Sequence, residues 1–174
     1  MMAVPVDEAL IALFAEGTIS PRVIFFSMNE DDVRVALKQP FVSVGSDASA
    51  PSDKARAENT AVHPRAYGTF PRVLGHYARD EKLFPLEEAV RKITSQAALR
   101  ANIHDRGILR EGMKADIVIF DPATNRDLST FEDPHHFSEG ISDVIVNGVP
   151  VLRDGVMTRA KPGRTIRGKG YVKK

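Results

Sequence analysis

An aspartate and an arginine, Asp47 and Arg65, are the side chains whose positions best suit a chemical role. Asp47 follows the apolar run "FVSVGS" at residues 41–46, which is typical of a buried strand. The carboxyl ends of buried strands are where α/β folds place their functional sites. An aspartate also caps turns and helices. Position alone therefore does not decide whether Asp47 is a functional carboxylate or a cap for the loop that follows.

Arg65 belongs to the segment that ends this polar loop. The chain returns to an aromatic segment through His63, Pro64 and Arg65. Because a proline keeps the residue before it out of the α region, this segment is predicted to be extended. Side chains two positions apart on an extended segment point to the same side, so His63 and Arg65 can face one site. The alternative is a surface loop with incidental charge.

The other histidines give little support to a metal site. His135 and His136 are adjacent in the polar stretch 123–140, and adjacent side chains do not face one another in regular structure, which disfavours a two-histidine zinc site. His76 is predicted on a helix and His104 in a turn, in structural or exposed positions. The sequence has no cysteine, phosphate-binding loop, dinucleotide fingerprint or nucleophile elbow.

The composition is that of an ordinary soluble globular domain. Apolar residues make up 43% and charged residues 27% of the 174 positions. The 24 basic and 23 acidic side chains leave a formal charge of +1, which gives no reason to expect a nucleic acid or an anionic membrane as partner. No apolar run is long enough for a membrane span, and the amino terminus lacks the pattern of a signal peptide. The sequence therefore predicts a cytoplasmic protein that binds neither nucleic acid nor membrane.

The first part of the chain predicts alternating helices and strands. Apolar spacing indicates helices at residues 6–14 and 29–39, and near-continuous apolar runs indicate buried strands at 22–28 and 41–46. Asn29 is the expected N-cap of the second helix. A strand, a helix and a strand with short connections predict a parallel pair with a right-handed crossover, the pattern of an α/β fold.

The pattern changes to antiparallel β structure in the second part. Helices are predicted at 70–80 and 85–102, and a strand at 115–122. The segment 141–156 predicts further strands, because it contains two dipeptides that favour hairpin turns, Asn147-Gly148 and Asp154-Gly155.

Several segments occur in an order that resembles one family. They include "FFSMNEDDV", "VGSDA", "HPRAYGTFPRVLGHYARD", "DRGILREGMKADIVIFDP" and "VIVNGVPVLRDG", of which "HPRAYGTFPRVLG" at residues 63–75 is the most specific. By these motifs the chain resembles the carboxyl-terminal portion of N-acyl-D-amino-acid deacylases (D-aminoacylases), members of the amidohydrolase superfamily. The resemblance covers nearly the whole chain and departs from the pattern at Ala48, where a glycine is usual.

The resemblance implies a zinc-dependent hydrolase built on a (β/α)8 barrel of the TIM type, with a small antiparallel β-sandwich beside it. Residues 1–102 would then be the last strand–helix units of the barrel. Residues 103–174 would be the carboxyl-terminal part of the small β domain, with a basic tail.

The same resemblance assigns roles to the two site residues. In such enzymes the metal lowers the pKa of a bound water and polarises the amide carbonyl of an N-acyl-D-amino acid. Asp47 matches the carboxylate that takes the water's proton and passes it to the departing amine. Arg65 matches an arginine that holds the substrate's α-carboxylate through two parallel hydrogen bonds.

The metal ligands of the family are not matched by this sequence. They are histidines and a cysteine or carboxylate on earlier strands, beginning with a His-x-His pair, and the chain has neither His-x-His nor cysteine. Asp47 is the one candidate metal ligand among the matched residues. We therefore expect zinc in the complete enzyme, no stoichiometric zinc in this chain alone, and an internal segment at its start.

The sequence leaves two alternatives to a catalytically incomplete fragment. One is a non-catalytic half of a split enzyme, which binds a separate amino-terminal half, or self-associates, through exposed barrel edges. The other is a refolded remnant, a small α/β domain without a ligand.

Overall fold

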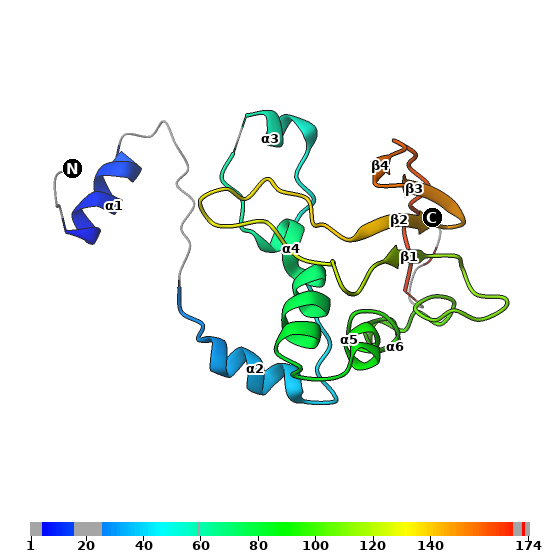
Figure 1. Cartoon of the computed structure of the whole chain (residues 1–174). Coiled ribbons are helices and arrows are strands. Elements are labelled where there is room, and N and C mark those ends of the chain that lie inside the picture. Colours follow the sequence, from blue (N-terminus) through cyan, green and yellow to red (C-terminus); the bar gives the residue numbers. More distant parts are fainter. Residues whose placement is uncertain (1–4, 16–25, 59, 169–171, 173–174) are drawn as a thin grey trace.

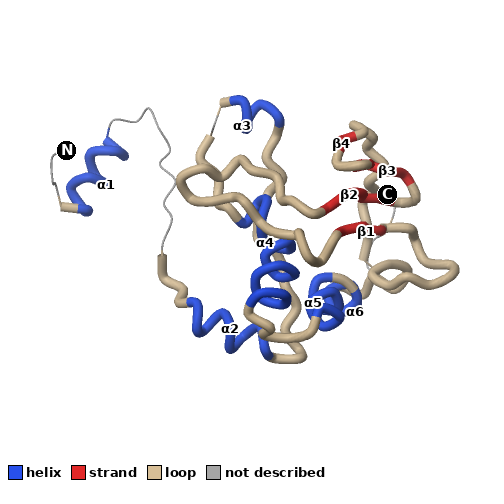
Figure 2. The backbone as a smooth tube through the Cα atoms, viewed as in Figure 1, coloured by secondary structure: helices blue, strands red, loops and turns tan. Residues whose placement is uncertain are grey.

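The computed structural model describes residues 5–15, 26–58, 60–168 and 172 (Figure 1). The helices are α1 (Val6–Ala15), α2 (Glu30–Lys38), α3 (Asp53–Ala57), α4 (Arg65–Arg72), the π-helical segment η1 (Val73–Asp80), α5 (Leu86–Ile93) and α6 (Ser95–Arg100). The strands are β1 (Ile117–Phe120), β2 (Ile141–Val146), β3 (Val149–Arg153) and β4 (Val156–Met157). Figure 2 shows that the helices come first along the chain and that the strands gather into one sheet at its end.

Local signals in the sequence explain several of these elements. Asn29 precedes α2, and its Oδ1 accepts hydrogen bonds from two backbone N–H groups of the first turn at 2.7 and 3.3 Å, as predicted for an N-cap. Asn147 and Asp154 both have a φ of 49° and precede glycines of positive φ, which is the backbone of the predicted hairpin turns. The strands are antiparallel neighbours in the order β1-β2-β3-β4, so the predicted change to an antiparallel β part is confirmed.

The buried strand predicted at residues 41–46 is wrong, because this segment belongs to no strand. A strand requires a second extended segment to complete its hydrogen bonds. The backbone N–H of Val44 instead donates to the carbonyl oxygen of Lys92 in α5, at 3.3 Å. Of the expected partner strand, 22–28, the first four residues lie outside the described ranges and the remainder forms no strand. The predicted parallel pair is therefore absent from the part of the chain that the structure describes.

The helix predicted at 85–102 is divided at Thr94 into α5 and α6. Thr94 departs from helical geometry, with φ −126° and ψ −94°. Its hydroxyl donates to the carbonyl oxygen of Val90 at 2.6 Å. Such a bond to the preceding turn competes with the helical backbone bonds, which accounts for the break.

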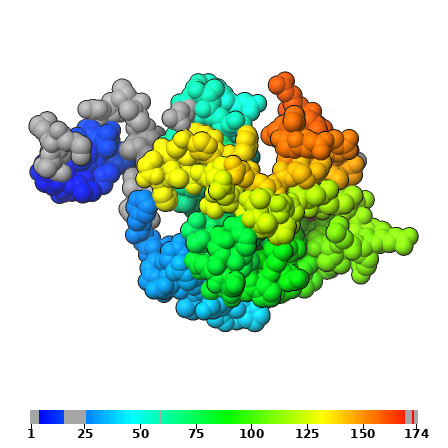
Figure 3. All heavy atoms as spheres, viewed as in Figure 1, coloured from blue at the N-terminus to red at the C-terminus, as the bar shows by residue number. Residues whose placement is uncertain are grey.

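The helix predicted at 70–80 begins earlier, at Arg65, and continues as η1. Pro71 lies inside it and has no backbone N–H, so the carbonyl oxygen of Tyr67 lacks its helical donor. The hydroxyl of Ser138 donates to that oxygen instead, at 3.2 Å. This bond ties the polar stretch 123–140 to α4, and Figure 3 shows the yellow surface of that stretch between the cyan region of α3 and the green helices.

The apolar core is built mainly around η1. Its buried apolar side chains are Leu37, Val73, Leu74, Tyr77, Ala78, Phe84 and Ala89. α1 contributes no buried residue and lies apart from the other elements in Figure 1. Among the described residues, no helix is both long and apolar enough to cross a bilayer.

Gly75 in η1 marks a close approach between this core and the loop that carries Asn125. A methyl group added at residue 75 would lie 2.4 Å from the carbonyl oxygen of Asn125, which also accepts a 2.6 Å hydrogen bond from Arg79. Asn125 is fully buried, so its backbone has little room to move. This contact holds the start of the 123–140 stretch against the helix.

We expect Gly75→Ala to lower the free energy of unfolding by about 1–3 kcal/mol, the usual cost of overpacking. The higher helix propensity of alanine opposes this loss, but it stabilises the substituted helix by at most about 1 kcal/mol. The destabilisation by overpacking should therefore prevail. Gly163→Ala is the matched control, since nothing lies within 4 Å of the methyl group that it adds. Urea unfolding monitored by circular dichroism measures both changes. A Gly75→Ala protein as stable as the parent would contradict the close approach.

Candidate active site

The structure brings the two predicted site residues together. A guanidinium nitrogen of Arg65, Nη2, lies 3.0 Å from the carboxylate oxygen Oδ2 of Asp47. The Asp47 side chain is 89% exposed and that of Arg65 is 43% exposed, so both can be reached from solvent. The pair is therefore an accessible acid and cation at one point of the surface.

Asp47 is placed by an unusual backbone geometry and not by the end of a strand. Its φ is 46°, in the left-handed region that aspartate tolerates better than most residues. The next helix, α3, has Ser52 as its N-cap, with Oγ accepting the N–H of Ala55 at 3.1 Å. Asp47 is therefore not the cap of that helix, and its carboxylate faces Arg65.

Arg65 is placed by the first turn of α4. The prediction of an extended segment around Pro64 is wrong, because Pro64 has helical angles, φ −49° and ψ −29°, and α4 begins at Arg65. The fixed φ of proline suits a helix start, where its missing N–H has no partner to lose. The ring nitrogen Nδ1 of His63 accepts the backbone N–H of Arg65 at 3.0 Å and so caps the same turn.

A second contact fixes α4 from the side of the 123–140 stretch. His135 Nε2 lies 2.7 Å from the carbonyl oxygen of Thr60, and Nδ1 lies 2.9 Å from the hydroxyl of Tyr67. Since a carbonyl can only accept, Nε2 carries the hydrogen and Nδ1 accepts from Tyr67. His135 therefore joins three segments, and both of its ring nitrogens are occupied in doing so.

The remaining histidine contacts are also structural. His136 lies 2.7 Å from Asp133, and His76 lies 2.9 Å from Glu81. Within the described ranges no group of three or more histidine, cysteine, aspartate or glutamate side chains could hold a metal ion. Asp47 faces a guanidinium, so the described residues do not fit a zinc site by themselves.

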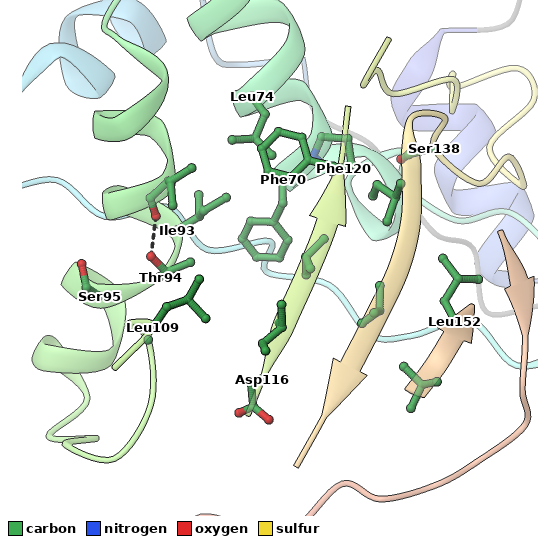
Figure 4. Close-up of a pocket in the computed structure, with 18 of the residues that line it drawn as sticks. Phe70, Leu74, Ile93, Thr94, Ser95, Leu109, Asp116, Phe120, Ser138 and Leu152 are labelled. Atoms are coloured by element: carbon green, nitrogen blue, oxygen red, sulfur yellow. Dashed lines mark hydrogen bonds between the residues drawn. The ribbon is translucent and has the colours of Figure 1, made fainter. Parts of the chain in front are cut away.

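An apolar hollow of about 1020 Å³ lies between the helices and one face of the sheet (Figure 4). Phe70, Leu74 and Ile93 line it from the helices, and Phe120 and Leu152 line it from the sheet. Neither Asp47 nor Arg65 belongs to its lining. The hollow is therefore separate from the polar pair.

A model of the amidohydrolase family matches residues 43–152, which include Asp47 and Arg65. Over 143 residues the chain is 47% identical to a D-aminoacylase from Alcaligenes xylosoxydans xylosoxydans, a match that covers 82% of this chain and 28% of the relative. The chain thus spans less than a third of that relative's length.

Two solved structures are similar as well. A D-aminoacylase with a binuclear metal center has a TM-score of 0.70 at 43% identity, over 78% of this chain and 27% of the other. An N-acyl-D-glutamate deacylase from Bordetella bronchiseptica, complexed with zinc and a phosphonate inhibitor, has a TM-score of 0.65 at 38% identity, over 78% and 28% of the two chains. These similarities confirm the resemblance to N-acyl-D-amino-acid deacylases that the motifs predict.

The cap on α4 should depend on pH through His63. Burial, and after it the nearby Arg65 guanidinium, lower the pKa of His63 below its usual 6.5. The cap requires an unprotonated Nδ1. Its contribution is therefore fully present above the pKa of the unfolded chain and is lost as the pH falls through the lower pKa of the folded chain.

An NMR titration of the His63 ring should accordingly give a midpoint below 6.5. Arg65→Met should raise this midpoint only part of the way, because the effect of burial remains. A midpoint above 6.5 in the parent protein would contradict the placement of the ring.

Proposed function

Because the chain belongs to the amidohydrolase family, we propose that it forms the carboxyl-terminal portion of a metal-dependent hydrolase that releases D-amino acids from N-acyl-D-amino acids. The observation that carries the proposal is the 3.0 Å contact between Asp47 and Arg65, inside the segment that matches the family. An acid–base group and a carboxylate-binding group are the two functions that such a substrate requires from side chains.

Asp47 would act as the proton carrier. Its exposed carboxylate can take a proton from the attacking water and return it to the departing nitrogen. An amine leaves poorly unless it is protonated, so one group that acts first as base and then as acid serves both steps.

Arg65 would hold the α-carboxylate of the substrate. In the structure this guanidinium is paired with Asp47, but an exposed ion pair contributes only about 0–1 kcal/mol. A substrate carboxylate that makes two parallel hydrogen bonds can therefore displace Asp47. The displacement would free the Asp47 carboxylate for proton transfer at the same moment as the substrate is fixed.

The zinc ligands would lie in the part of the enzyme that corresponds to the unmatched length of the relatives. The described residues do not by themselves fit a metal site. In this proposal, residues 1–102 correspond to the last part of the barrel and residues 103–174 to the small β domain.

A second candidate function is binding of a separate amino-terminal portion of such an enzyme, or of a second copy. The apolar hollow of about 1020 Å³ favours it, as do the exposed β-strand residues Val118, Ile119 and Met157. Sedimentation of the chain, alone and mixed with the amino-terminal portion of the Alcaligenes D-aminoacylase, distinguishes a hetero-complex from self-association.

A chimera provides the test of catalysis. In it, the 174-residue chain replaces the matching 28% of the Alcaligenes D-aminoacylase. Asp47→Asn keeps the shape of the side chain and removes the proton acceptor, so kcat should fall about 100-fold or more, with substrate binding retained. Asp53→Asn, on exposed α3, is the matched control and should leave kcat unchanged. Near-normal turnover of the Asp47→Asn chimera would exclude the proposed role.

Arg65→Met should act through the substrate's carboxylate. Because Arg65 is 43% exposed, we expect a loss near the low end for a hydrogen-bonded charge pair, about 2 kcal/mol or roughly 30-fold in kcat/KM. Arg65→Lys keeps the positive charge but lacks the planar guanidinium that makes two parallel hydrogen bonds, so it should recover only part of the loss in kcat/KM.

The control for Arg65 is a substrate analogue whose α-carboxylate is replaced by a neutral amide. It should be hydrolysed equally well by the parent and Arg65→Met chimeras. An equal loss of kcat/KM on both substrates would mean that Arg65 stabilises the loop and does not bind the substrate.

A further inference from the structure

The ammonium group of Lys92 in α5 is buried and binds backbone rather than solvent. The side chain is 1% exposed. Its Nζ donates to the carbonyl oxygens of Gln39 and Val42 at 2.5 and 3.1 Å, and lies 3.5 Å from Glu88 Oε1. Three acceptors thus face a group with three N–H bonds.

Two arginines continue this pattern along the same backbone. Arg91 Nη2 donates to the carbonyl oxygen of Pro40 at 2.7 Å. Arg100 Nη2, from the end of α6, donates to that of Phe41 at 3.1 Å. When the Lys92 bonds are included, each carbonyl oxygen from residue 39 to 42 accepts a hydrogen bond from a lysine or arginine of α5 or α6.

Glu88 pairs with two of these cations, Lys92 and Arg91. Its carboxylate accepts two hydrogen bonds of 2.7 Å from Arg91 and lies near Lys92. Chiefly through the Arg91 bonds, the pKa of Glu88 is lowered to about 2. The carboxylate therefore stays ionised at physiological pH.

These bonds take the place of a β ladder. Residues 41–46 belong to no strand, yet their backbone groups need partners when they pack on the core, as Val44 does. Hydrogen bonds from charged donors are about twice as strong as neutral ones. The backbone is held up to Val44, whose N–H donates to the Lys92 carbonyl oxygen at 3.3 Å. Asp47 follows three residues later.

We propose that Lys92 is a positioning residue for the site: by holding the backbone at residues 39–44, it sets where Asp47 lies relative to Arg65. Arg91 and Arg100 assist at the neighbouring carbonyls. The effect on catalysis rests on the function proposed for Asp47. The effect on the backbone does not, so the two can be tested apart.

The absence of cysteine makes a clean structural test available. Lys92→Cys creates the only thiol in the chain. In the unfolded protein it is alkylated with 2-bromoethylamine, which restores an ammonium of nearly the original length, or with 1-iodopropane, which gives an uncharged side chain of the same length. The two refolded proteins then differ only in whether the side chain at position 92 ends in an ammonium group or a methyl group.

Amide hydrogen exchange by NMR is measured in both. The S-aminoethyl protein should match the parent, whereas the amide of Val44 in the S-propyl protein should exchange at least tenfold faster. Leu74 in η1 should be unchanged in both proteins. Equal exchange at Val44 in the two refolded proteins overturns the proposal. If the S-propyl protein does not refold, Arg100→Met replaces it, and unchanged exchange at Val42 and Val44 in that variant is the overturning result.

The catalytic part is tested in the chimera. Lys92→Met should lower kcat at least tenfold while KM stays within twofold, because Lys92 acts through Asp47 and not on the substrate. In the Asp47→Asn background, Lys92→Met should cause no further loss. Additive losses, or an unchanged kcat, overturn the positioning role. If Asp47→Asn itself leaves kcat intact while Val44 responds as expected, the proposed function fails and the structural role of Lys92 stands.

Discussion

The buried ammonium of Lys92 is the interaction on which the placement of the site depends. The backbone from Gln39 to Val42 runs against α5 and α6, and no strand among the described residues lies beside it, so its carbonyl oxygens need donors from elsewhere. Lysine and arginine side chains supply these donors, and Glu88 pairs with two of them, Arg91 and Lys92. The fixed carbonyl oxygens thereby set the position of Asp47 relative to Arg65, although residues 41–46 belong to no strand.

A separate set of contacts places Arg65 beside Asp47. The ring of His63 caps the first turn of α4, and the bond from Tyr67 to His135 ties that turn to the stretch that follows the helices. The two halves of the pair are therefore fixed by separate sets of contacts, and the ion pair itself, being exposed, is weak. A weak pair between well-placed groups suits a site in which the substrate must replace one partner without disturbing the backbone.

The sequence predicts those features that are determined locally. Asn29 marks the start of α2, and Asn147-Gly148 marks a hairpin, because a cap and a turn depend on neighbouring residues alone. The apolar run at 41–46 looks like a strand, but strand formation depends on a partner segment that the local sequence does not specify. The burial of Lys92 cannot be predicted from the sequence for a related reason: helical periodicity does not show that a lysine is buried against two backbone carbonyl oxygens. Asp47 is identifiable only through its position in a recognisable motif.

We propose that this chain supplies the acid–base carboxylate and the carboxylate-binding arginine of a deacylase specific for D-amino acids. The most direct measurement is the hydrolysis rate of the zinc-loaded chimera with an N-acetyl-D-amino acid and with its L enantiomer. We expect turnover of the D substrate and little or none of the L substrate. A chimera that folds and binds zinc but hydrolyses neither enantiomer would contradict it.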